Sequence, residues 1–91
     1  ATQAYWWRDV AGLLCVDEDE EDEVKSLMIR WAACAPQNLC DLLEDFAQFA
    51  AQKGYEKASW IAPLQPQIVC ALEETGYQAA WDFSLYIFEY R

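Results

Sequence analysis

The chain has 91 residues, enough for one small domain, and a formal net charge of −10 with only six basic residues. Because a phosphate-binding surface needs clustered lysine and arginine, this composition argues against nucleic acid and against anionic membranes as partners. The sequence also lacks an apolar run of the roughly 18 residues that a membrane span requires. We therefore expect neither nucleic acid nor membrane among its partners.

Large aromatic side chains are unusually numerous for a chain of this length. Apolar types make up 55% of the residues, with five Trp, five Tyr and four Phe. A domain this small buries only a modest share of its surface, so its core has limited room for rings. Two interpretations stay open. All the rings pack internally, or some lie at an interface with a partner or a second copy.

The cysteines and the missing histidine bound the chemistry. The four cysteines form no C-x-x-C pair and the chain has no His, which argues against a zinc site and excludes Ser-His and Cys-His catalysis. They are Cys15, Cys34, Cys40 and Cys70. Most lie among apolar neighbours, so we interpret them as reduced thiols of a cytoplasmic protein. Residues 1–4 show no signal-peptide pattern.

The first third of the chain predicts strands around an acidic run. Residues 5–16 are rich in aromatic and β-favouring types and read as strand, with Gly12 suggesting either a bulge or a break into two short strands. Seven consecutive acids follow, from Asp17 to Glu23. Residues 24–35 fit either a helix, with Leu27, Met28, Trp31 and Ala35 on one face, or a strand, with Leu27, Ile29, Trp31 and Ala33 on one face. We favour the strand, which makes the acidic run the tip of a β-hairpin.

The acidic run does not match a calcium-binding EF-hand loop. Its sixth position, Asp22, should be Gly, and its twelfth, Met28, should be Glu. Three interpretations stay open: a solvated loop, loose binding of divalent ions, and electrostatic contact with a basic partner.

The rest of the chain predicts helix, strand, helix and strand. Asn38 is a good N-cap for a helix that Gly54 ends. Its apolar stripe consists of Leu39, Leu42, Leu43, Phe46, Phe49 and Ala50. A strand over residues 55–62 stops at Pro63, and a helix over residues 65–75 opens at Pro66 and closes at Gly76. The order around residues 24–62 predicts a parallel strand pair.

The last segment, residues 78–90, alternates as one long strand. One face carries Trp81, Phe83, Leu85 and Ile87, and we expect it to point inward. The other carries Tyr86, Phe88 and Tyr90, which we predict to form a contact surface for another chain. Taken together, these elements predict a single domain over residues 1–91. Its fold class is α/β (α+β), a mixed sheet with two helices.

This succession resembles the C-terminal half of the Gcn5-related N-acetyltransferase (GNAT) fold, an acyl-CoA N-acyltransferase fold. The resemblance rests on the order of hairpin, strand, link, long helix ending at Gly54, strand, and second helix. Thr75-Gly76-Tyr77 stands where the family has Leu-Gly-Phe. The resemblance covers most of this chain but about half of a full GNAT fold. The family's first strand and two helices, which usually carry the acceptor contacts, have no counterpart here.

The resemblance implies where acetyl-CoA and a catalytic acid would lie. The family's glycine-rich pyrophosphate loop corresponds to Gln37, Asn38 and Leu39, where this chain has neither glycine nor a basic residue. The tyrosine that commonly lies four residues before the second helix's glycine is Leu72 here, which cannot donate a proton. Gln65 falls where the family often has Asn.

The sequence thus favours a degenerate acetyltransferase-like module that acts without catalysis, cofactor or metal by associating with itself or another chain. The alternative is an N-acetyltransferase using acetyl-CoA, whose site a missing N-terminal part or a second protomer completes. A small adaptor unrelated to this family is a third hypothesis.

Overall fold

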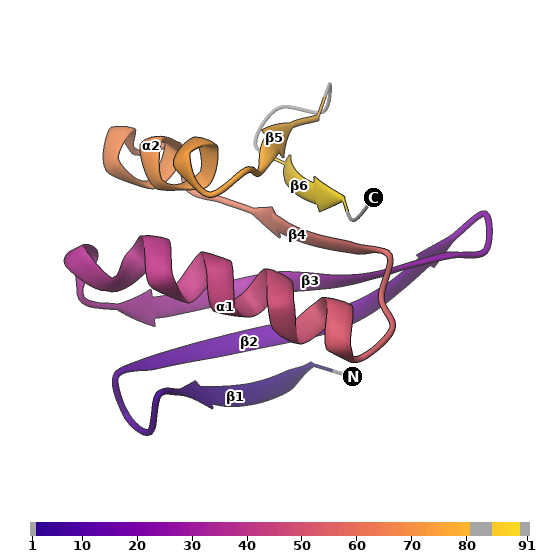
Figure 1. The fold of residues 1–91 in the computed structure, drawn as a ribbon, viewed down its shortest axis with the longest axis horizontal. Helices are drawn as coiled ribbons and strands as arrows, with labels where there is room; N and C mark the ends of the chain where they lie inside the picture. The colour runs from indigo at the N-terminus through magenta and orange to yellow at the C-terminus, as the bar shows by residue number, and fades with distance from the viewer. Residues whose placement is uncertain (1, 81–84, 90–91) are drawn as a thin grey trace.

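The computed structural model describes residues 2–80 and 85–89, which form an α+β domain with a six-stranded mixed sheet and two helices (Figure 1). The strands are β1 (Gln3–Trp7), β2 (Gly12–Glu21), β3 (Val24–Cys34), β4 (Lys57–Ile61), β5 (Gln78–Ala79) and β6 (Leu85–Glu89). The helices are α1 (Leu39–Gln52), which follows the 3-10 turn η1 (Pro36–Asn38), and α2 (Pro66–Glu74). The predicted fold class is confirmed.

The strands lie in the order β1-β2-β3-β4-β6-β5. Strands β3 and β4 are parallel, as predicted for two strands joined through a helix, and the other neighbouring pairs are antiparallel. The sheet therefore begins with a three-stranded meander and ends with a short hairpin.

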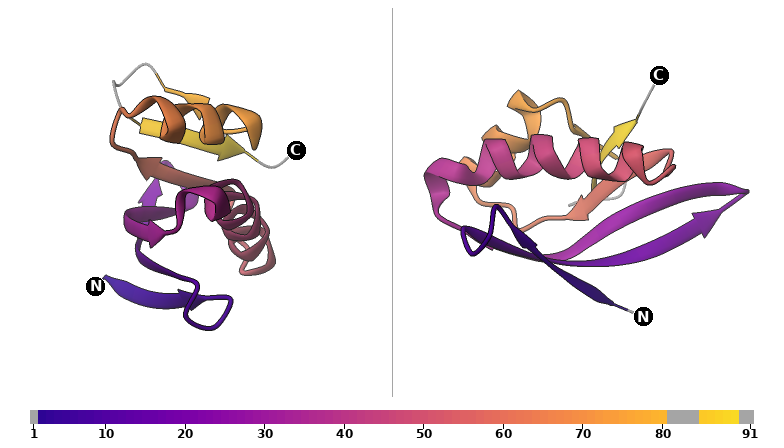
Figure 2. Two further views of the ribbon diagram at one scale, coloured as in Figure 1. Left: turned by 90° about the vertical axis from the view of Figure 1, so that its left-hand side faces the viewer. Right: turned by 60° about the horizontal axis from the view of Figure 1, so that its bottom comes forward.

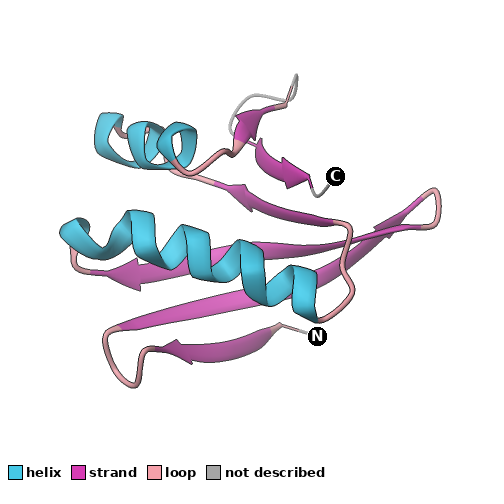
Figure 3. Ribbon diagram, viewed as in Figure 1, coloured by secondary structure: helices cyan, strands magenta, loops and turns pink. Residues whose placement is uncertain are grey.

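Residues 24–34 form a strand, which confirms the favoured interpretation. Strand β3 pairs with β2 on one side and β4 on the other, and these ladders outweigh the helical spacing of its apolar residues. The acids Asp17–Glu21 extend β2, while Asp22 and Glu23 make the turn with φ angles of 53° and 67°. The tip of this hairpin projects past the end of α1 (Figure 3).

A β-bulge in β3 changes which side chains face the helices. Cys15 pairs with Trp31 and Val16 pairs with Ile29, which leaves Arg30 as an extra residue between them. The predicted strand face is therefore wrong beyond Ile29. Trp31 lies on the opposite face, 53% exposed, whereas Ala32 packs against the core.

Both helices pack on one face of the sheet, and the core fills the space between the helices and the sheet (Figure 2). Helix α1 buries Leu42, Leu43 and Phe46, as its amphipathic spacing predicts. Asn38 holds the predicted N-cap position, but its side chain makes no capping hydrogen bond. After α2, Tyr77 lies in the core and its hydroxyl donates a 2.8 Å hydrogen bond to the Leu43 carbonyl.

The last segment differs from the predicted long strand. It forms the short antiparallel pair β5 and β6, and Trp81, Phe83 and Tyr90 lie outside the described residues. Tyr86 pairs with Trp60 on the helix-covered face and is 7% exposed. Phe88 lies on that face too, 5.4 Å from the Tyr77 ring between centroids.

Tyr86 and Phe88 therefore lie on the helix-covered face, buried and partly buried respectively, and their role as a contact surface for another chain stays a prediction. Leu85 and Ile87, expected to point inward, lie on the opposite face of the sheet. Alternation along a strand separates two faces but does not say which one the helices cover. In the part of the chain that the structure describes, no helix is long and apolar enough to cross a membrane.

Candidate functional site

A cleft opens at the carboxyl ends of the parallel strands β3 and β4. The register pairs the two strands as far as Ile29 and Trp60, after which β3 continues to Cys34 while β4 ends at Ile61. The cavity measures about 290 Å³. It is lined by Ala32, Ala33, Cys34, Pro36, Leu39, Trp60, Pro63, Gln65, Gln67 and Ile68. Ligands of open sheets with parallel strands commonly bind at this kind of edge.

The structure brings some of the sequence-predicted site residues to this cleft. Leu39 and Gln65 line it, and Gln37 and Asn38 lie beside it in η1. The Leu39 N–H, which would have to bind a phosphate, donates instead to the Pro36 carbonyl. In the part of the chain that the structure describes, no lysine or arginine lines the cleft.

These groups define what the cleft can bind. Its walls are apolar, and the side-chain amides of Gln65 and Gln67 supply hydrogen-bonding groups. That combination suits an uncharged chain with a carbonyl or amide better than a pyrophosphate, which needs positive charge or free N–H groups. Leu72, at the position of the family's catalytic tyrosine, is fully buried in the core.

The thiols near the helices are not activated nucleophiles. Burial raises the pKa of Cys34, which lines the cleft. Burial and then the Glu74 carboxylate raise the pKa of Cys40, and a hydrogen bond to Glu74 raises that of Cys70. Because the thiolate is the reactive form, these thiols are protonated and weakly nucleophilic at neutral pH. Among residues 2–80 and 85–89, no cluster of His, Cys, Asp or Glu is placed to hold a metal ion.

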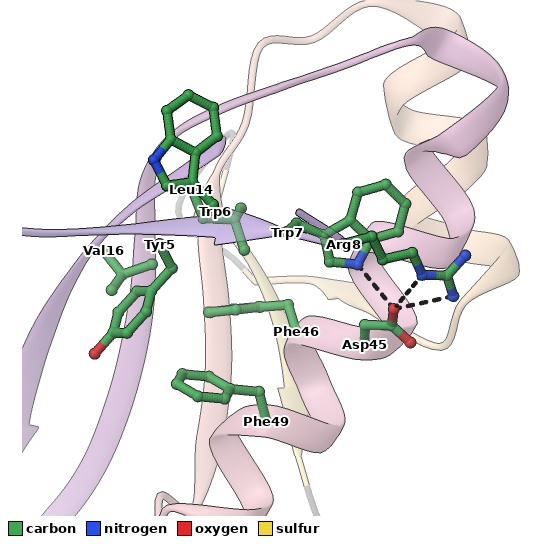
Figure 4. A pocket seen from close by; sticks show the side chains of 9 residues that line it. All are labelled: Tyr5, Trp6, Trp7, Arg8, Leu14, Val16, Asp45, Phe46 and Phe49. Carbon is green, nitrogen blue, oxygen red and sulfur yellow. Dashed lines mark hydrogen bonds and ion pairs between the residues drawn. The ribbon is translucent and has the colours of Figure 1, made fainter. Parts of the chain in front are cut away.

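A second cavity, the aromatic pocket, lies between strands β1 and β2 and helix α1 (Figure 4). Its volume is about 310 Å³. It is lined by Tyr5, Trp6, Trp7, Arg8, Leu14, Val16, Asp45, Phe46 and Phe49. Tyr5 and Phe49 meet edge to face, with 5.1 Å between ring centroids. Trp6 points away from this ring cluster in Figure 4.

One end of the aromatic pocket is closed by a polar cluster on Asp45. The Trp7 Nε1–H donates to Asp45 Oδ2 at 2.8 Å, and the Arg8 guanidinium contacts the same oxygen at 3.1 Å. Arg8 also pairs with Asp41 at 3.4 Å and lies over the Trp7 ring. Because these groups are partly exposed, we assign the cluster an orienting role: it holds the β1–β2 turn against α1.

Strand β1 is an edge of the sheet. It pairs with β2 alone among the strands that the structure describes, and it exposes Tyr5 and Trp6. Sequence reasoning missed this site because it placed the bulge or break of residues 5–16 at Gly12, whereas the turn spans residues 8–11 and makes β1 a separate edge strand. The turn residues Arg8 and Asp9 both have positive φ. Asp commonly occupies such turn positions, but Arg does not, and no glycine follows Asp9.

Comparisons with protein-family models, curated proteins and solved structures found no match for this chain. The acetyltransferase resemblance is therefore a hypothesis that rests on the order of the elements and on the residues quoted for it.

Proposed function

We propose that this chain is a non-catalytic, acetyltransferase-like association module that pairs with a second copy through the edge strand β1. The observation that carries the proposal is the position of β1. It is an open edge rich in aromatic side chains, and it adjoins the aromatic pocket. Unpaired edge strands offer rows of N–H and C=O groups that bind another strand.

Strand addition at β1 would use both the unpaired edge of that strand and the adjoining aromatic pocket. A strand pairing with β1 continues the sheet through main-chain hydrogen bonds. Its alternate side chains then lie on the face that α1 covers, next to Tyr5 and Phe49. An apolar or aromatic side chain fits there, because the walls of the pocket are mostly rings and aliphatic groups.

Charge supports a second copy as the occupant. The chain carries −10 overall, but residues 2–16 contain only Arg8 and Asp9 as charged groups, so their formal charge is zero. Two copies that meet along β1 therefore juxtapose neutral strands rather than acidic ones. A two-fold antiparallel pairing of β1 with its copy is the simplest closed arrangement.

The absence of catalysis is the other half of the proposal. The position of the family's general acid is the buried Leu72, and the described residues that line the cleft include no cation to hold a pyrophosphate. The free thiols of the four cysteines agree with the reducing cytoplasm, where we place the protein.

The test is the oligomeric state, measured by analytical ultracentrifugation from micromolar to millimolar protein. We expect a dimer for the wild type and a monomer for Tyr5→Lys, because lysine on an edge strand blocks strand addition. Val10→Lys is the matched control, since Val10 is 75% exposed in the β1–β2 turn and should leave the dimer intact. A monomeric wild type, or a dimeric Tyr5→Lys variant with native circular dichroism, contradicts the proposal.

The position of the cleft, at the carboxyl ends of β3 and β4, supports one alternative function. In it, the chain is part of an N-acetyltransferase that binds acetyl-CoA, with a missing N-terminal part or a second protomer completing the site. Calorimetric titration with acetyl-CoA separates the two proposals. Saturable binding at micromolar ligand that Gln65→Ala weakens would place the enzyme first, and silence up to millimolar ligand would reject it.

A further inference from the structure

The face of the sheet opposite the helices carries a groove of about 230 Å³. Its position follows from the strand register, which places Met28, Ser59 and Ile87 side by side across β3, β4 and β6. Leu85 extends its apolar wall along β6. The groove thus combines aliphatic walls with a small residue between them.

Ser59 is the unusual member of this row. It is 3% exposed, and its Oγ has no hydrogen-bond partner among residues 2–80 and 85–89. Its chain neighbours Ala58 and Trp60 belong to the core on the helix-covered face, so the Ser59 side chain points to the groove. A buried hydroxyl without a partner is costly, and a ligand group that hydrogen bonds to it removes that cost.

One end of the groove is acidic. Asp19 and Glu21 line it from the exposed part of β2, next to Asp22 in the turn. Among the described residues that line the groove, Lys57 is the only basic one, and it already faces Glu89 at 3.7 Å. A positively charged ligand is therefore favoured at this end, and an anionic one is opposed.

We propose that this groove binds an amphipathic helix rich in lysine or arginine from another protein. The apolar stripe of such a helix packs on Met28, Leu85 and Ile87. The aliphatic stem of one basic side chain crosses the groove, and its N–H donates to Ser59 Oγ. Neighbouring cations pair with Asp19 and Glu21. Helices are the usual cover for an apolar sheet face.

A second copy of this chain does not fit the groove. Each copy carries −10 with six basic residues, so a copy approaching the acidic end would be repelled. The proposal thus goes beyond association through β1 and does not depend on it.

The probe is a synthetic helical peptide of about 16 residues with leucines on one face and lysines on the other, long enough for about four turns. Its matched control replaces every lysine with glutamate. Isotope-edited NMR titration should shift the Met28 and Ile87 methyl signals with the lysine peptide only. Calorimetry at low and high salt should show binding that weakens with salt, because the cations contribute to it.

Two variants of the groove test the roles of its groups. Asp19→Asn with Glu21→Gln should weaken binding about tenfold and flatten its salt dependence. The control pair Glu44→Gln with Glu73→Gln removes the same charge from exposed positions on α1 and α2 and should leave affinity nearly unchanged. Ser59→Ala should raise the melting temperature and weaken binding severalfold, whereas a merely structural role would change stability alone.

Several results would overturn the inference. These are no binding below millimolar peptide, equal losses in the two charge-removal pairs, or methyl shifts confined to the helix-covered face. Tyr5→Lys should bind the lysine peptide as the wild type does. That result separates a failure of this groove from a failure of the β1 interface.

Discussion

The two faces of the sheet differ although the same strands build them. On the helix-covered face, Ile29, Ala58 and Trp60 are buried against α1 and α2. On the opposite face, Trp6 is 66% exposed, Trp31 53% and Ile61 50%. Strand alternation creates both faces, but only one is covered by the helices of this chain. The many aromatic side chains of this chain are therefore divided between the core and the exposed face of the sheet.

We expect the largest difference in the free energy of unfolding between two single substitutions in β3. Ile29→Ala should lower the free energy of unfolding by about 2–5 kcal/mol, because it deletes a fully buried side chain and leaves a cavity. Trp31→Ala should lower it by about 1–2 kcal/mol, because only the buried half of that ring loses its contacts. Urea denaturation monitored by circular dichroism measures both. Equal losses would mean that the two faces are not distinct.

A smaller effect concerns the buried hydroxyl on the covered face. Tyr77→Phe removes the hydrogen bond to the Leu43 carbonyl and should cost about 1 kcal/mol. Tyr5→Phe is the control, because the Tyr5 hydroxyl bonds to Gln3 at the exposed edge. The same denaturation experiment compares them, and a neutral Tyr77→Phe would show that this bond adds nothing to the core.

Replacing the two turn residues at the acidic hairpin tip should increase the stability of the fold. Asp22 and Glu23 both adopt left-handed backbone angles, which Asn and Gly accept more readily. Asp22→Asn with Glu23→Gly should therefore raise the free energy of unfolding by about 0.5–1 kcal/mol. If the melting temperature falls instead, the tip is held by contacts other than its own turn.

The smallest effect is visible only at alkaline pH. A hydrogen bond from the Tyr55 hydroxyl to the Glu18 carboxylate raises the pKa of Tyr55 to about 12. Tyrosine in an unfolded chain ionises near ~10. The bond therefore stabilises the fold fully below that pH, and its contribution is lost as the pH rises through the folded value.

Tyr55→Phe tests this effect. The difference in unfolding free energy between wild type and variant should be constant up to pH ~10 and shrink toward pH ~12. Chemical denaturation of the wild type and the variant at several alkaline pH values measures it. A difference that does not change with pH would show that the pair does not form.

Much of the fold was predictable because local signals and burial agree. The α1 stripe, Gly54 and Gly76 with positive φ, and Pro66 at the start of α2 lie where the sequence predicts. These signals depend on backbone conformations and periodicities that each segment carries itself. The sequence favoured a strand over a helix at residues 24–34 but did not decide between them, because the apolar spacing fits both. Pairing with β2 and β4 decides for the strand.

The candidate site was less predictable, since it depends on contacts between distant residues. Leu39 and Gln65 were noted from the sequence, but nothing local indicates that both line one cleft. The orphan hydroxyl of Ser59 looks like any serine in a strand until its neighbours on β3 and β6 bury it.

The fold class, the ends of both helices and the acidic character follow from composition, capping and periodicity, which are properties of local sequence. Which face of each strand is covered depends instead on contacts between strands and helices that are distant in the sequence. The bulge at Arg30 moves Trp31 to the open face, and the pairing of β6 with β4 turns Tyr86 into the core. Register is set between strands, and a shift of one residue exchanges the two faces.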